Sequence, residues 1–185
     1  MNKRFITYLL LSSLLVACNT PTPDEKKEYE RILDKGYAVF YGDYYSDAGL
    51  KNNILSLDLY SSGITLDNSG RATGVGTNVY LSDIFLQPTD TFLPQGKYVT
   101  DTTAAPMTFL AGIQYDNEVS GAYLLDIKEN SYSVLLVKRG EMNISFSHDS
   151  TIIDFTLLLA DSAHTVYNGQ YRGKLIYYDG REKND

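Results

Sequence analysis

Residues 141–159 read EMNISFSHDSTIIDFTLLL, and this stretch decides the fold class. In each half, apolar residues occupy every second position, with mostly polar residues between them. The apolar positions are Met142, Ile144 and Phe146 in the first half and Ile153, Phe155, Leu157 and Leu159 in the second. Strict alternation buries one face of a strand and leaves the other in water, which is typical of antiparallel sheets. The polar residues 148–150 between the halves predict a tight turn, so we expect a β-hairpin here.

The same period of two runs along the chain from Tyr37 onward, for example through Leu55, Leu57 and Leu59. No long segment after Gly36 has helical spacing. Turns are predicted at residues 67–70, 94–96, 139–140 and 168–169, each of which contains a glycine. Residues 37–180 are therefore expected to form an all-β domain of roughly nine or ten strands.

The connections between these strands leave two architectures open. The longer stretches at residues 87–92 and 101–106 favour crossovers, and hence an antiparallel β-sandwich. The succession of hairpins in the second half favours a closed, lipocalin-like β-barrel as the alternative. We expect the sandwich.

The first 17 residues have the order of a secretory signal peptide. Lys3 and Arg4 give a positive start, residues 5–16 are mostly apolar, and the small residue Ala17 precedes Cys18. The apolar stretch is shorter than the roughly 20 residues that a transmembrane helix needs. A cleaved signal is therefore a better interpretation than a retained membrane anchor.

Leu15-Val16-Ala17-Cys18 resembles the lipobox of bacterial lipoproteins, and Cys18 is the only cysteine of the chain. The resemblance implies cleavage after Ala17 and attachment of acyl chains to Cys18. Several acyl chains make a lasting anchor, because each buried methylene group contributes about 0.8 kcal/mol. The expected partner of Cys18 is therefore the membrane.

Residues 19–23 are polar and contain two prolines, which predicts an extended tether. Asp24 and Glu25 resemble the acidic stretch that directs lipoproteins of the Bacteroidetes to the outer face of the outer membrane, although an ordinary linker has the same composition. A short helix is predicted over Asp24–Lys35. Its signals are the acids at its start, an apolar face of Tyr29, Ile32 and Leu33, and Gly36 as its stop. Residues 181–185 are expected to be a disordered tail.

The charge of the chain excludes one class of partner. The formal net charge is −7, and without Lys3 and Arg4 the chain has 14 basic residues against 23 acidic ones, a net charge of −9. Such a domain repels phosphate backbones, so we expect no nucleic-acid binding. Once Cys18 carries lipid, no thiol remains for a disulfide or for cysteine catalysis.

No constellation of residues predicts catalysis, a metal or a cofactor. His148 and His164 have acids and serines beside them in the sequence, whereas the side chains of a hydrolase triad converge from separate parts of a fold. Both histidines are interpreted as turn residues. Gly74-Val75-Gly76 lacks the third glycine of a nucleotide loop and is expected to be a loop or bulge. The chain is therefore expected not to be an enzyme.

Four acids, Asp58, Asp83, Asp126 and Asp154, each lie within an apolar strand. Calcium needs several converging oxygen ligands, and the spacing of these acids does not form a loop of alternating carboxylates. We interpret them as acids on the wet face of a strand.

The 16 tyrosines are the most distinctive feature of the composition. Tyr37, Tyr41, Tyr44 and Tyr45 crowd the first strand, and Tyr177 and Tyr178 lie on the last. A tyrosine has a flat apolar ring with a polar tip, which suits contacts with sugars or proteins. If the first and last strands pair, Tyr41, Tyr44, Tyr45, Tyr177 and Tyr178 would form one ligand-binding surface. The alternative is that tyrosine covers a sheet face simply because it is a good strand former.

Taken whole, the chain resembles the small Bacteroidetes-type lipoproteins of unknown function with an all-β domain. The residues that carry the resemblance are Leu15–Cys18, the polar leader, the Tyr-rich strands and the turn at residues 93–98. It implies a role in glycan capture, adhesion or assembly at the cell surface. We expect a lipid-anchored, non-catalytic binding protein of the outer membrane that faces outward and recognises a glycan or a protein. A periplasm-facing location, a structural or assembly subunit of an envelope complex, and a lipocalin-like carrier are the alternatives.

Overall fold

The alternating apolar residues build an all-β fold, as the sequence predicts, in the computed structural model of the chain. The structure describes residues 31–181, except 68–69, 117 and 130. Within these residues there are fifteen strands, of which nine have four residues or more, and one 3-10 turn, η1 (Ser46–Ala48). The longer strands are β2 (Lys35–Gly42), β3 (Asn53–Tyr60), β6 (Gly76–Leu86), β7 (Gly96–Thr100), β11 (Ala122–Lys128), β12 (Ser131–Ser147), β13 (Ser150–Leu159), β14 (Val166–Gly173) and β15 (Ile176–Asp179). The short ones are β1 (Arg31–Leu33), β4 (Ile64–Leu66), β5 (Ala72–Gly74), β8 (Thr108–Phe109), β9 (Ile113–Tyr115) and β10 (Glu118–Ser120).

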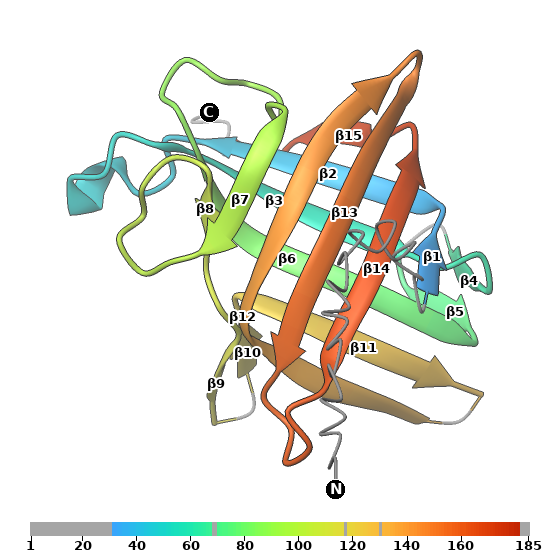
Figure 1. The fold of residues 1–185 in the computed structure, drawn as a ribbon. Helices are drawn as coiled ribbons and strands as arrows, with labels where there is room; N and C mark the ends of the chain where they lie inside the picture. Colours follow the sequence, from blue (N-terminus) through green and yellow to red (C-terminus); the bar gives the residue numbers. More distant parts are fainter. Residues whose placement is uncertain (1–30, 68–69, 117, 130, 182–185) are drawn as a thin grey trace, which may run out of the picture.

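Two layers of strands cross each other at a steep angle (Figure 1). The front sheet has the order β1-β14-β13-β12-β7, and the back sheet has the order β11-β6-β3-β2-β15. The layers are joined on one side by β8, which pairs with both β7 and β6, and on the other by β12, which pairs with β11. The hydrogen-bonded path β12-β7-β8-β6-β11 therefore closes on itself. The fold thus combines the two packed layers of a sandwich with a closed ring of five strands.

Strand β12 passes from one layer to the other without a turn. Its first half pairs with β11 up to Leu136, and its second half pairs with β13 from Val137, with a register shift between Val137 and Arg139. The hairpin turn predicted at Arg139-Gly140 is therefore wrong. A two-residue hairpin turn needs positive φ angles, and neither residue has one. Gly140 instead allows β12 to pack closely against β13, because a Cβ atom at this position would lie 2.5 Å from Leu157 Cδ2.

The turn predicted at Asn168-Gly169 is also wrong, since both residues lie inside β14. Gly169 is directly opposite Phe155 on β13, and a Cβ atom at Gly169 would lie 2.3 Å from Phe155 Cε2. The glycine makes room for the aromatic ring across the strand pair. The ring of Tyr167 then stacks on Phe155 with a centroid separation of 5.9 Å.

The other predicted turns are confirmed. His148 and Asp149 connect β12 to β13, and His148 has the positive φ of +53° that a tight turn uses. Between β4 and β5, the Gly70 N–H donates to the Asp67 carbonyl at 2.9 Å. Gly96, the last residue of the predicted turn at residues 94–96, is the first residue of β7.

The core lies between the two sheets and consists of the predicted alternating positions. In β12 and β13, six of the seven are at most 4% exposed: Met142, Ile144, Ile153, Phe155, Leu157 and Leu159. Phe146 is the exception at 50%, because it lies near the hairpin tip, beyond the covering sheet. Side chains from both sheets form one buried cluster, which includes the fully buried Tyr98 and Tyr171.

The helix predicted over Asp24–Lys35 is wrong in the part that the structure describes. Residues 31–33 form β1, which runs parallel to β14, and β2 begins at Lys35. Leu33 is buried while Ile32 is 64% exposed, so neighbouring side chains point in opposite directions, as in a strand. The β domain therefore begins before the predicted boundary at residue 37. The predicted signal peptide, Cys18, the tether and residues 24–30 lie outside the described residues.

At the other end, the predicted disordered tail begins one residue too early. Arg181 donates two hydrogen bonds to the carboxylate of Asp179, at 2.8 and 2.6 Å, and its guanidinium lies 5.6 Å above the ring of Phe40. These contacts fix Arg181 against β2. Residues 182–185 lie outside the described residues.

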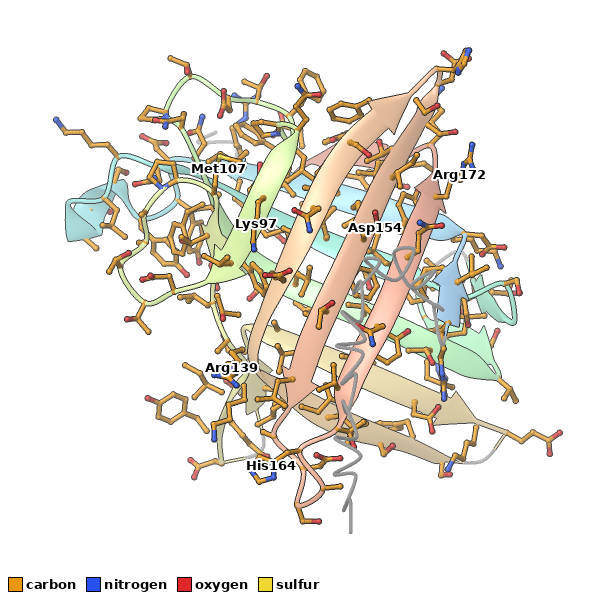
Figure 2. The ribbon with its side chains drawn as sticks, in the orientation of Figure 1. Lys97, Met107, Arg139, Asp154, His164 and Arg172 are labelled. Atoms are coloured by element: carbon orange, nitrogen blue, oxygen red, sulfur yellow. The ribbon has the colours of Figure 1, made fainter. Side chains whose placement is uncertain are left out.

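The outward faces of the two sheets differ in chemistry. The front sheet carries cross-strand polar pairs, such as Lys97 with Glu141 at 2.7 Å and Gln170 with Asp154 at 2.7 Å. Figure 2 shows Lys97 and Asp154 on this face. Charged ladders of this kind are what a solvated sheet face requires. In the back sheet, in contrast, most of the tyrosine side chains lie on the outward face.

Candidate functional site

One row of cross-strand neighbours on the back sheet consists of three tyrosines and an aspartate. Tyr37 on β2 is opposite Asp58 on β3, which is opposite Tyr80 on β6, and Tyr80 is opposite Tyr123 on β11. Leu57, next to Asp58, belongs to the core, so this row points away from the core. Even so, Ile54 and Ser56 on the same outward face of β3 are only 2% and 3% exposed. Their burial shows that other groups cover the outward face.

Two β-bulges flank this part of β3. On β2, Phe40 pairs with Leu55 and Gly42 with Ile54, so Tyr41 is an extra residue. On β6, Ile84 pairs with Leu55 and Leu81 with Leu57, so Ser82 and Asp83 together face Ser56. Bulges re-aim side chains and are common next to binding sites. Here they turn Tyr41 and Asp83 toward one hollow.

This hollow, which we call the tyrosine groove, has a volume of about 280 Å³. It is lined by Tyr41, Tyr44, Tyr45, Ile54, Ser56, Tyr80, Ser82, Asp83, Val119 and Ser120. Ile54, Ser56 and Tyr80 come from the sheet. One wall comes from the segment that leads into η1 after β2, and the other from the β9–β10 hairpin. The groove is slightly smaller than the roughly 300–1,000 Å³ of common small-molecule sites, so it suits one ligand group.

Asp83 is fixed at the groove by two hydrogen bonds. The Tyr45 hydroxyl donates to Asp83 Oδ1 at 2.8 Å, and the Ser82 hydroxyl donates to Asp83 Oδ2 at 3.0 Å. Burial, together with the carboxylate of Asp83, raises the pKa of Tyr45 well above its ordinary value, so its hydroxyl remains a donor. Asp83 has a φ of +48°, a region that few residues other than glycine adopt. Such backbone strain collects at functional sites.

A second polar cluster lies beside the groove on the same face. Asp58 accepts hydrogen bonds from the Tyr60 hydroxyl and from Asn78 Nδ2, both at 2.5 Å. Burial raises the pKa of Asp58, and these two hydrogen bonds only partly offset that effect. Asp58 does not line the tyrosine groove, so this cluster supports the sheet rather than opening to a ligand.

The structure brings together three of the five predicted tyrosines. Tyr41, Tyr44 and Tyr45 line the tyrosine groove. The strands predicted as first and last, β2 and β15, run parallel and pair, as the aromatic-surface hypothesis requires, although Tyr44 and Tyr45 lie after β2 and not on it. Tyr178 nevertheless stacks on Tyr37, with ring centroids 6.1 Å apart, and does not line the groove. Tyr177 lies on the inward face, where it packs against the core and the ring of Phe92.

The groove residues of β6 were not predicted as site residues from the sequence. Tyr80 faces outward through the register of β6 on β3, whereas Asp83 reaches the groove because a bulge interrupts the alternation of the strand. The signal in the sequence is the pair Ser82-Asp83, where two polar residues stand together inside an apolar run. A strict period of two would have placed only one of them on the outward face.

The four acids of the apolar strands go to different places. Asp58 and Asp83 lie on the outward face of the back sheet. Asp154 lies on the outward face of the front sheet, and Asp126 forms an ion pair with Arg31 at 3.2 Å. Within residues 31–181, leaving out the few undescribed positions, no group of three or more His, Cys, Asp and Glu side chains could hold a metal ion. None of the helices in this part of the chain could cross a membrane.

Comparisons with protein-family models, with curated proteins and with solved structures find no match.

Proposed function

We propose that the chain is a lipid-anchored, non-catalytic binding protein of the cell envelope that recognises a glycan or a protein through the tyrosine groove. The observation that carries the proposal is the convergence of Tyr41, Tyr44, Tyr45 and Tyr80 on one hollow. Tyrosines offer large apolar contact area at low entropic cost and a polar tip for orientation. Tyrosines that only covered a sheet face would not require the two β-bulges that form a hollow in it.

The first residues of the chain support the proposed location. The lipobox-like Leu15-Val16-Ala17-Cys18 supports lipid attachment at Cys18, and Asp24 and Glu25 support export to the outer face of the outer membrane. A periplasm-facing domain is the alternative.

An assembly subunit of an envelope complex is the second candidate, and β15 favours it. This strand ends the back sheet, and within the described residues its only strand partner is β2. Ile176 and Tyr178 on it are 48% and 53% exposed. An unpaired edge with apolar side chains is a ready docking place for a strand of another protein. A carrier function would need ligand space between the sheets, where the buried cluster of side chains lies instead.

The test is a binding screen with full-length protein purified in detergent, against a glycan array and against extracted envelope proteins. Tyr44→Ala should abolish or strongly weaken capture of any ligand found, since Tyr44 lines the groove and is already 61% exposed, so its loss costs little stability. Tyr132→Ala is the matched control, because Tyr132 is 72% exposed and does not line the groove. A ligand whose binding survives Tyr44→Ala and Tyr41→Ala would overturn the proposal.

A further inference from the structure

The tyrosine groove has a negative charge and no lining group that balances it. Among the described residues, Asp83 is the only charged one that lines the groove, and no Lys, Arg or His side chain of this part lines it. In the described part of the chain, no basic side chain lies within ion-pair distance of Asp83. The carboxylate accepts one hydrogen bond at each oxygen, and each oxygen has a further lone pair to offer. The groove therefore has capacity for a donor that carries positive charge.

The aromatic walls point to the same chemistry. Tyr44 and Tyr45 have ring centroids 5.0 Å apart and planes at 83°, and Tyr41 and Tyr44 have centroids 6.1 Å apart and planes at 65°. Because the rings are steeply inclined to one another, their faces point in different directions. A cation is attracted to the face of an aromatic ring within about 6 Å of its centroid, and aromatic boxes of this kind bind alkylammonium groups. The Tyr45 hydroxyl also holds Asp83 beside these rings.

We propose that the tyrosine groove binds an organic ammonium group of its ligand, with Asp83 as the counter-charge and Tyr41, Tyr44 and Tyr45 as the aromatic walls. The proposal rests on the proposed function and names the ligand chemistry of the same site. An anionic ligand would be repelled by Asp83. A neutral sugar would donate hydroxyl hydrogen bonds to the carboxylate but would not balance its charge. A hard metal cation would find one carboxylate where it needs several oxygen ligands.

The experiment compares probes in matched pairs that differ in charge but hardly in shape. Choline is paired with 3,3-dimethylbutan-1-ol, N-acetyl-lysine amide with N-acetyl-norleucine amide, and glucosamine with glucose. These pairs distinguish a quaternary ammonium, the amine of a peptide and the amine of an amino sugar as the source. Binding to the full-length protein in detergent is followed by NMR shift changes of the groove residues. At least one charged probe should bind about tenfold or more tightly than its neutral partner.

Two variants separate charge from shape. Asp83→Asn should weaken the charged probe by about tenfold and leave its neutral partner unchanged. Asparagine also tolerates the positive φ of this position, so the variant keeps the fold. Tyr44→Ala should weaken the charged probe by a similar factor. Asp149→Asn, in the β12–β13 turn, and Tyr132→Ala are the matched controls and should bind the probe like the wild type.

The outcomes distinguish this inference from the proposed function. Equal binding of the two members of every pair, or full affinity of Asp83→Asn for the charged probe, would overturn the ammonium inference and leave the groove as a ligand site. A ligand found in the screen that carries no amine, and that binds through Tyr44, would do the same. Shift changes confined to a region outside the groove would overturn both.

Discussion

Two buried tyrosines of the core, Tyr98 and Tyr171, differ in what their hydroxyl groups bind. The Tyr98 hydroxyl donates to the Pro94 carbonyl at 3.0 Å, whereas the Tyr171 hydroxyl is buried without a hydrogen-bond partner among the described residues. A buried unsatisfied hydroxyl costs about 1–3 kcal/mol. Tyr171→Phe should therefore raise the free energy of unfolding by about 1 kcal/mol, and Tyr98→Phe should lower it by a similar amount. Urea unfolding of the two variants measures both. A loss of stability in Tyr171→Phe as large as that in Tyr98→Phe would mean that the hydroxyl has a partner outside the described residues.

Asp58 gives the stability of the protein a dependence on pH. Burial raises its pKa above the ordinary value of 3.8, so the folded state keeps the proton to a higher pH than the unfolded state does. Below 3.8 both states are protonated, and as the pH rises toward the raised pKa only the unfolded state ionises. Asp58 therefore lowers the free energy of unfolding as the pH rises through this window. The stability of the wild type minus that of Asp58→Asn should fall over the same window, measured by urea unfolding at a series of pH values.

Asp101 provides a control of opposite sign. Hydrogen bonds from Thr103, including its N–H at 2.6 Å, lower the pKa of this exposed carboxyl. The stabilisation of the folded state by the ionised Asp101 carboxylate is present above its ordinary pKa and is lost as the pH falls through the lowered pKa. The stability of the wild type minus that of Asp101→Asn should thus rise with pH. If both differences changed in the same direction, the assignment of the Asp58 effect to burial would be wrong.

At the scale of the strand pair, Gly169 and Phe155 should be energetically coupled. Gly169→Ala places a Cβ atom 2.3 Å from Phe155 Cε2, and the Phe155 ring is only 1% exposed and cannot move away. Overpacking of this kind costs about 1–3 kcal/mol. The cost should be smaller when Gly169→Ala is introduced into Phe155→Leu, which shortens the opposing side chain. A double-mutant cycle measures this coupling by urea unfolding. Additive effects of the two substitutions would contradict the contact.

The elements that the sequence predicts correctly are those set by local chemistry. The β12–β13 hairpin follows from alternation on both sides of His148-Asp149, a turn that needs no distant partner. Turns were predicted at Gly140 and Gly169, but these glycines allow two strands to pack closely and have no positive φ. The sequence does not distinguish these two roles of a glycine. Which role applies depends on Leu157 and Phe155 on the facing strand. The predicted helix failed for a similar reason, because β14 pairs with residues 31–33 from far along the chain.

The candidate site divides in the same way. Tyr41, Tyr44 and Tyr45 could be predicted as a cluster because they are close together in the sequence. Tyr80 and Asp83 reach them only through the register of β6 on β3 and the bulge within it, which the sequence of β6 alone does not determine. Tyr177 and Tyr178 were both assigned to the ligand surface, although adjacent residues of a strand point to opposite faces. Tyr177 is the one that points inward.

At the scale of the whole molecule, the outward faces of the two sheets differ in chemistry. The front face has cross-strand ion pairs and amide–carboxylate pairs, which stabilise a solvated surface. The back face has the tyrosine groove. A lipid on Cys18 followed by a polar tether would leave either face free to turn toward a ligand. The location of the domain therefore decides which ligands it can meet.

Replacement of Cys18 by Ala tests the anchor. The wild type should fractionate with membranes and the variant with the soluble fraction, because several acyl chains hold a protein on a bilayer and a tether alone does not. The urea midpoint of the two proteins should be equal, which shows that the substitution leaves the domain folded. Membrane association that persists in Cys18→Ala would contradict lipid anchoring.

Protease treatment of intact cells then tests on which side the domain lies. If it faces outward, added protease should digest it while a known periplasmic protein in the same cells is spared. Protease treatment of lysed cells is the control that the folded domain can be cut at all. Digestion on intact cells would make external glycans and host proteins the ligands to screen for an ammonium group. Protection on intact cells, with digestion after lysis, would contradict the surface location and favour an amine-bearing partner inside the envelope, to be found by crosslinking at Tyr44.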